Sequence, residues 1–231
     1  MKAGSKQATH SNDGVGNLGH LIQAAHMGYI LTPIAVDLKQ VSAEVGSKNT
    51  QLLAVLVDTF SDGFEQFDEM AVNASDEEAG QQPLTMRAAL TQMIMGEEYD
   101  KSFGFMYGYA FEFICRYFGD YLPNNEWWAM PSGSWAATVD QEMGNVGVPA
   151  NVLRVEHHLM YCGAPIAIPE SDGFPGIGYL TGKEIETAQK AFGEAKLAAI
   201  TDKSVLTSIL EIQGWLTACA LSSRDLVCFY A

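Results

Sequence analysis

The six residues Asp225–Tyr230, DLVCFY, form the strongest strand candidate in the chain. They are rich in the branched and aromatic side chains that favour strands. A second candidate, residues 28–37 (GYILTPIAVD), lies near the other end, and Pro33 favours a position at a sheet edge because proline cannot donate a ladder hydrogen bond. If these strands pair, the two ends close into one unit. We therefore expect an α+β fold, a single mostly helical domain with a small sheet that pairs the N- and C-terminal strands.

Apolar residues at helical spacing predict the helices between these strands. One amphipathic helix is expected to run through residues 53–71, and shorter helices are expected over 84–95 and around 135–143. Thr181 and Glu184 match a capping box, and a last helix follows Asp202. Residues 1–26 are polar and rich in Gly and Ser. They predict a flexible leader before a single globular domain over residues 27–231.

Residues 103–121 contain nine Phe or Tyr and are the most aromatic segment. We favour a buried helix whose small face carries Gly104 and Gly108. A strand remains the alternative because the aromatics alternate at first, and periodicity alone cannot decide a continuous apolar run.

Composition excludes several classes of protein. With 231 residues, 48% of them hydrophobic, the chain can bury a core. Its net charge of −15 argues against binding to nucleic acid or to an anionic membrane, both of which require clustered Lys and Arg. No signal peptide or membrane span is apparent, and the four cysteines form no CxxC pair. We expect a cytoplasmic protein with buried free thiols.

Two stretches carry a family resemblance, PIAIPESDGFPGIGYLT at residues 165–181 and GWLTACALSSRDLVCFY at residues 214–230. Over about residues 30–231 the chain resembles an uncharacterised bacterial family with a PxPxPDDFPxIGYLT core and a GRDLVCFY ending. The resemblance implies no activity and no catalytic residues. The chain departs from the family pattern at Gly173, where an acidic residue is replaced, and at Ser223. The first departure would matter if that loop bound a cation.

Two glycine motifs resemble nucleotide or anion sites. Residues 14–19 match GxGxxG, but no buried strand precedes them as the dinucleotide fold requires, so we interpret them as leader. Gly176 and Gly178 precede a predicted helix and could cradle an anion. We favour glycines that allow a tight turn, since acidic residues lie nearby.

No motif predicts catalysis or a metal. His158 and Cys162 would share a face of a helix, but two ligands are too few for zinc, which takes three or four. The nucleophile elbow GxSxG and the zinc motif HExxH are absent. We therefore expect no catalytic residues, no metal and no cofactor.

The negative charge is concentrated. Residues 57–100 contain eleven acids against Arg87 alone, a charge of −10. On the predicted helix the acids lie opposite the phenylalanines, and such like-charge repulsion indicates either a solubility device or a basic partner. Trp127 and Trp128 cannot easily share one core pocket, because neighbouring residues point in different directions. We favour one indole in the core and the other over a loop, and the alternative is that one is exposed as an anchor for a partner. The predicted contact residues are Asp58, Asp62, Glu65, Glu69, Asp76, Glu77, Glu78, Trp127 and Trp128.

These features predict a non-enzymatic acidic protein-binding domain. The specific hypothesis is an immunity protein or antitoxin that neutralises a basic toxin such as a nuclease, with no nucleic-acid or membrane partner. The alternative is a small-molecule-binding domain or enzyme whose pocket forms between the aromatic segment 103–121 and the loop 165–181. The oligomeric state stays open.

Overall fold

The structure, a computed structural model, describes residues 29–75, 81–124, 126–129 and 133–231. The predicted leader and the GxGxxG motif lie outside this part. Within it, a four-stranded antiparallel sheet has the order β2-β1-β4-β3. Its strands are β1 (Leu31–Val36), β2 (Asp120–Tyr121), β3 (Gly176–Leu180) and β4 (Asp225–Tyr230). Strands β1 and β4 pair along their full length, from Leu31 opposite Tyr230 to Val36 opposite Asp225. The predicted pairing of the N- and C-terminal strands is confirmed.

Strand β1 lies inside the sheet rather than at its edge, because the two-residue strand β2 pairs with its other side. Pro33 fits there because β2 ends opposite its neighbour Ile34, so no amide is needed at this position. The Pro33 carbonyl accepts a hydrogen bond from the Leu122 amide at 3.0 Å.

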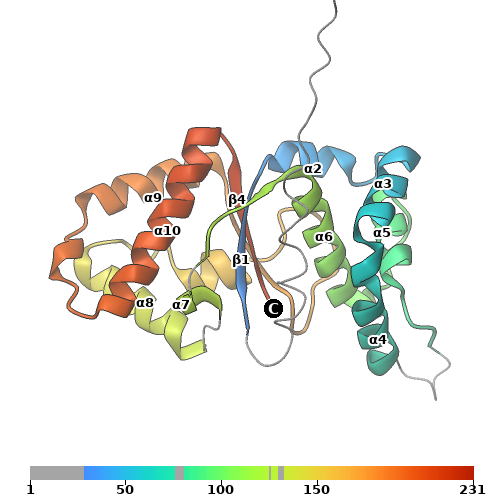
Figure 1. The fold of residues 1–231 in the computed structure, drawn as a ribbon, viewed down its shortest axis with the longest axis horizontal. Coiled ribbons are helices and arrows are strands. Elements are labelled where there is room, and N and C mark those ends of the chain that lie inside the picture. Colours follow the sequence, from blue (N-terminus) through green and yellow to red (C-terminus); the bar gives the residue numbers. More distant parts are fainter. Residues whose placement is uncertain (1–28, 76–80, 125, 130–132) are drawn as a thin grey trace, which may run out of the picture.

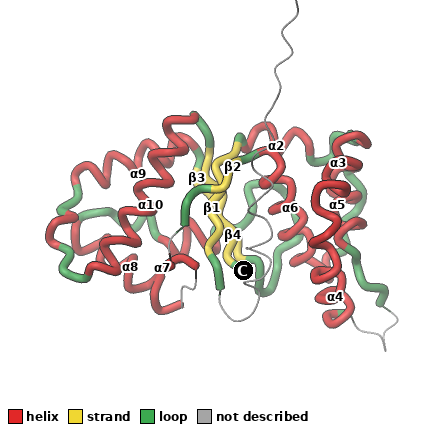
Figure 2. Tube along the Cα trace, in the orientation of Figure 1, coloured by secondary structure: helices red, strands yellow, loops and turns green. Residues whose placement is uncertain are grey.

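Helices cover both faces of the sheet, as Figures 1 and 2 show. One layer contains α2 (Leu38–Glu44), α3 (Thr50–Phe60), α4 (Phe64–Ala74), α5 (Met86–Met95) and α6 (Gly104–Phe118). The other contains α7 (Glu126–Ala129), α8 (Gly133–Val146), a π-helix (Val155–Tyr161), α9 (Gly182–Glu194) and α10 (Lys203–Ser222). The described part of the chain is therefore a mostly helical α+β fold.

Strand β4 is buried on both faces. Val227 and Phe229 belong to the core under α2–α6, whereas Leu226, Cys228 and Tyr230 belong to the core under α7–α10. This strict alternation explains why DLVCFY is apolar almost throughout, since a strand covered on both sides needs no polar face.

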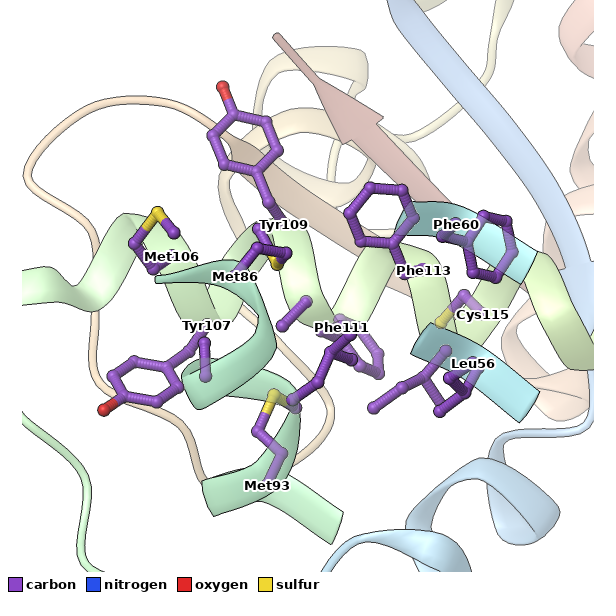
Figure 3. Close-up of a cluster of buried hydrophobic side chains, with 14 of the residues drawn as sticks. Leu56, Phe60, Met86, Met93, Met106, Tyr107, Tyr109, Phe111, Phe113 and Cys115 are labelled. Atoms are coloured by element: carbon purple, nitrogen blue, oxygen red, sulfur yellow. The ribbon is translucent and has the colours of Figure 1, made fainter. Parts of the chain in front are cut away.

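The aromatic segment folds as the helix α6, so the predicted helix is confirmed and the strand alternative is wrong. Figure 3 shows its side chains, among them Phe111 and Phe113, packed with residues of α3 and α5. The two glycines on the small face allow a close approach of another segment. A Cβ on Gly104 would lie 1.9 Å from the Glu170 carbonyl oxygen, and one on Gly108 would lie 2.8 Å from Pro175. The loop after the π-helix therefore packs directly on the small face of α6.

The prediction of one continuous amphipathic helix over residues 53–71 is wrong. A 3-10 turn at Ser61–Gly63 divides it into α3 and α4. Phe60 of α3 and Phe64 of α4 both pack on Phe113 of α6, at 4.9 Å and 5.6 Å between ring centroids. The turn contains Gly63, and glycine is unfavourable inside a helix, so a local signal accompanies the break.

The last two helices begin as expected. Glu184 accepts a hydrogen bond from the Thr181 amide at 2.8 Å, which closes the predicted capping box of α9. Asp202 caps α10 through the amides of Ser204 and Val205. Helix α10 is the one described helix long and apolar enough to cross a membrane, with a mean hydropathy of 1.3. Residues along one face, including Ile212 and Trp215, are buried against the rest of the fold, and 39% of the apolar window is buried.

Candidate functional site: an acidic groove

Helices α3 and α4 carry the described part of the predicted acidic surface. The side chains of Asp58, Asp62, Glu65 and Glu69 are all exposed. Asp76, Glu77 and Glu78 lie outside the described residues. The acids and the buried phenylalanines occupy opposite faces of these helices, as the periodicity predicts.

Two open grooves adjoin on this surface, and we refer to them together as the acidic groove. The first has a volume of about 440 Å³ and lies between α3 and α5, and the second has about 860 Å³ and lies between α4 and α5. Ser61 and Arg87 line both. The further residues of the first are Thr50, Leu53, Ala54, Val57, Asp58 and Thr91, and those of the second are Phe64, Glu65, Asp68, Glu69, Val72, Asn73 and Thr85.

The lining combines apolar surface with carboxylates. Val57 and Phe64 belong to the buried core, and Val72 is 48% exposed. Glu65 and Glu69 are exposed and line the second part of the groove, next to this apolar surface. A cleft of this kind can bind an apolar side chain and a cationic one at the same time.

The four groove carboxylates are not equivalent. Asp68 accepts a hydrogen bond from the Met86 amide at 2.6 Å and so supports the first turn of α5. Asp58, Glu65 and Glu69 form no ion pair with any residue that the structure describes. They are thus available to a partner, whereas Asp68 has a structural role.

The two tryptophans lie elsewhere. Trp128 is fully buried, its Nε1 donates to the Ser208 carbonyl at 3.2 Å, and its ring packs on Trp215 at 6.1 Å. Trp127 is half-buried and stacks on Trp135 at 5.2 Å. Helix α7, which carries both, lies on the opposite side of the sheet from α3 and α4 (Figure 1). The structure therefore does not bring the two indoles together with the acids, and Trp128 cannot contact a partner, because the α7–α10 core encloses it.

A second charged group surrounds Arg116 on α6. Its guanidinium lies 5.2 Å from the ring of Phe60, 5.3 Å from Phe113 and 5.5 Å from Tyr121. Its Nη1 lies 3.8 Å from Glu112 Oε1, and the Glu112 side chain is only 16% exposed.

Burial dominates the electrostatics of this group. It raises the pKa of Glu112, an effect that the Arg116 charge partly opposes. Burial also raises the pKa of Tyr109 to about 12, with a further contribution from the Glu112 charge. Sequence reasoning missed the group because its members come from α3, α6 and β2.

The π-helix carries the histidines that resembled metal ligands. The His158 ring accepts a hydrogen bond from the Arg154 amide at 2.9 Å, and burial lowers the pKa of this histidine. Asp140 of α8 accepts from the amides of Val155 and Glu156, at 2.6 and 3.2 Å. Among the residues that the structure describes, no three His, Cys, Asp or Glu side chains come together to hold a metal ion.

Three of the four cysteines are buried and Cys162 is half-buried; all four are free thiols. Burial raises the pKa of the Cys219 thiol to about 12 and holds those of Cys115 and Cys228 well above the ordinary value. None of these three thiols is therefore poised as a nucleophile.

Gly176 and Gly178 do not form a turn, and that interpretation is wrong. They lie in β3, where a Cβ on Gly178 would come within 2.3 Å of the Leu159 carbonyl carbon and one on Gly176 within 2.6 Å of the Met160 oxygen. The strand backbone packs on the π-helix backbone, so the glycines allow close packing rather than anion binding. Their spacing of two, typical of one face of a strand, was the available signal.

Arg224 and Asp225, at the start of the C-terminal ending that carries the family resemblance, stabilise the fold. The Asp225 carboxylate accepts from the Gly182 amide at 2.8 Å and from the Leu38 amide at 3.1 Å, at the first residues of α9 and α2. Arg224 forms an ion pair with Asp120 and donates to the Ala35 carbonyl, which holds β2 to the sheet.

Comparison with known proteins agrees with the resemblance seen in the sequence. Neither the curated proteins nor the solved structures contain a match to the chain. A family model matches residues 27–231, and these residues include every element described above. The chain belongs to the family described as a domain of unknown function, DUF7691.

Proposed function

We propose that this protein binds a basic protein partner through the acidic groove, as a non-enzymatic cytoplasmic domain. The specific form is an immunity protein or antitoxin that neutralises a basic toxin such as a nuclease. The observation that carries the proposal is the acidic groove itself, an open surface groove in which the exposed carboxylates of Asp58, Glu65 and Glu69 lie beside apolar side chains.

Charge supports association with a basic surface. The chain has a net charge of −15, and the acids of α3 and α4 are concentrated on one face. Such a field steers a cationic partner and accelerates its encounter at low salt. It would also compete for a surface that evolved to bind phosphates, as the surface of a nuclease has.

The shape of the groove favours one mode of recognition. Apolar side chains such as Leu53 and Phe64 lie between carboxylates along the line where two helices meet a third. A cationic amphipathic helix matches this arrangement, with its apolar face on the floor and its Lys and Arg against the acids.

Solubility alone would explain the charge but would not require a groove. The test therefore compares two triple variants of equal charge. The groove variant is Asp58→Lys, Glu65→Lys and Glu69→Lys. The control is Asp172→Lys, Glu186→Lys and Glu194→Lys, which alters exposed acids outside the groove. Both leave Asp68 intact, and circular dichroism checks that both fold.

The probe is a synthetic cationic amphipathic helix, titrated by calorimetry at low and at physiological salt. We expect the wild-type chain to bind, and the groove variant to lose roughly tenfold or more in affinity, since each charge-assisted contact contributes about 1.5 to 3 kcal/mol. The control variant should lose far less. Equal losses of affinity in both variants would show that only the net charge matters and not the groove. No binding by the wild type would overturn the proposal.

A further inference from the structure

Arg87 is the cation at the centre of the acidic groove. It is exposed, and it lines both parts of the groove together with Ser61. Asp58 lies in the first part, and Glu65 and Glu69 lie in the second. A segment that follows the whole groove would thus pass carboxylates, then this guanidinium, then carboxylates again.

The position of Arg87 is unfavourable for its own helix. It is the second residue of α5, which begins at Met86 after the cap Thr85. A positive charge in the first turn opposes the helix dipole, which favours acidic residues there. The placement of Arg87 is therefore not explained by the stability of α5.

The guanidinium is also unpaired inside the described part of the chain. The ion pairs found there involve Arg116, Arg154 and Arg224, but not Arg87. The Asp68 carboxylate lies at the start of α5, but it accepts a hydrogen bond from the Met86 amide and forms no ion pair with Arg87. Arg87 can therefore offer its planar set of donors to a carboxylate from outside.

We infer that Arg87 fixes the register of the partner by binding an acidic residue within an otherwise basic amphipathic segment. The inference rests on the proposed function, which it makes more specific. In this arrangement Lys or Arg on both sides of that acid meet Asp58 at one end and Glu65 and Glu69 at the other. A uniformly cationic segment would instead place a like charge against Arg87, and this repulsion selects against it.

The test uses a series of synthetic peptides based on the cationic amphipathic helix. One glutamate is moved through successive polar positions, and each peptide is paired with the same sequence carrying glutamine there. We expect the wild-type chain to prefer glutamate over glutamine at one central position by roughly tenfold at low salt, the effect of one charge-assisted contact. The Arg87→Glu variant should reverse this preference.

A matched control changes an exposed lysine outside the groove, Lys190→Glu, which should leave the preference unchanged. Circular dichroism checks that Arg87→Glu folds, because the new carboxylate adds to the repulsion among the groove acids while it removes the unfavourable charge from the first turn of α5.

Equal binding of glutamate and glutamine peptides at every position would overturn the role of Arg87, as would a preference that persists in Arg87→Glu. If the wild-type chain binds both kinds of peptide equally and the groove variant loses this binding, the proposed function stands and only the register is wrong. If no peptide binds the wild-type chain, both proposals fail.

Discussion

The Asp225 carboxylate binds the amide of Gly182, 43 residues away, through a 2.8 Å hydrogen bond at the start of α9. Its second oxygen binds the Leu38 amide at the start of α2, 187 residues away. Helices α9 and α2 cover opposite faces of the sheet. One side chain at the first residue of β4 therefore ties both helical layers to the central strand.

Removal of this carboxylate should destabilise the fold at two helix ends at once. We expect Asp225→Ala to lower the free energy of unfolding by about 1 to 4 kcal/mol, since each of the two lost contacts contributes about 0.5 to 2 kcal/mol. Urea denaturation measures the change. The control Asp202→Ala removes a cap from α10 alone and should cost about half as much. Equal losses in the two variants would show that the double contact adds nothing.

Close packing of β3 on the π-helix predicts that Gly178 tolerates no side chain. The nearest atoms to a new Cβ are backbone atoms, Leu159 C at 2.3 Å and His158 O at 2.5 Å, and they cannot move aside cheaply. We expect Gly178→Ala to destabilise the protein by about 3 kcal/mol, the upper range for overpacking.

The matched control for Gly178 is Gly214→Ala. Gly214 is exposed on α10, where a Cβ would meet nothing within 4 Å. This variant should stabilise the protein by about 0.5 to 1 kcal/mol because alanine favours the helix. If both variants behaved alike in thermal unfolding, the proposed close approach would be absent.

Ser223 ends α10 with a φ of 53° and a ψ of 40°, in the left-handed region that favours glycine. The family that the sequence resembles has glycine at this position. We expect Ser223→Gly to raise the free energy of unfolding by about 0.5 to 1 kcal/mol, as the steric cost disappears and part of the gain is offset by a more flexible unfolded chain. Ser222→Gly, inside the last turn, should act in the opposite direction. Chemical denaturation of the two variants beside the wild type distinguishes these outcomes.

The raised pKa of Glu112 predicts that the stability of the fold depends on pH. Because its pKa in the folded protein lies above its ordinary value of 4.5, the folded state holds the proton more tightly than the unfolded state does. Stability should then fall as pH rises through the raised pKa, and Glu112→Gln should be more stable than the wild type at neutral pH. The difference should vanish as pH falls below 4.5.

The other groups that face Glu112 should not titrate in this range. Tyr109, Tyr121 and Cys115 all have pKa values raised by burial. Denaturant unfolding of both proteins from pH 4 to pH 8 is the measurement. A variant less stable than the wild type at pH 8 would mean that the pair with Arg116 outweighs the cost of burial.

The strands β1 and β4 could be recognised because strand composition is a local signal, but their pairing joins segments far apart in the sequence and is a hypothesis that the structure confirms. The small face favours the helical state of the aromatic segment, with a strand as the open alternative. Strand composition, helix caps such as Asp202 and the small face of α6 depend on residues close in sequence. The break between α3 and α4 is not predicted by the apolar spacing, although Gly63, a residue type that is unfavourable in helices, lies within it. The apolar spacing continues across the turn, because Phe60 and Phe64 both pack on Phe113.

The candidate site, too, could be predicted only where its residues have local signals. Helical spacing predicts that Asp58, Glu65 and Glu69 lie on the face opposite the phenylalanines, and the structure places them there. The groove needs α5 beside α3 and α4, and no local pattern encodes that neighbour. Periodicity also could not place Trp128, because burial in the α7–α10 core depends on Ser208 and Trp215.

The sequence by itself therefore determined the fold class, the family, the two terminal strands and the concentration of negative charge over residues 57–100. Only the tertiary structure decided which core encloses Trp128, why Gly176 and Gly178 lack side chains and where Arg87 lies among the acids. The physical reason is the range of the interactions. Hydrophobic period and capping act within a few residues, whereas close packing and the Asp225 double cap join segments tens to hundreds of residues apart.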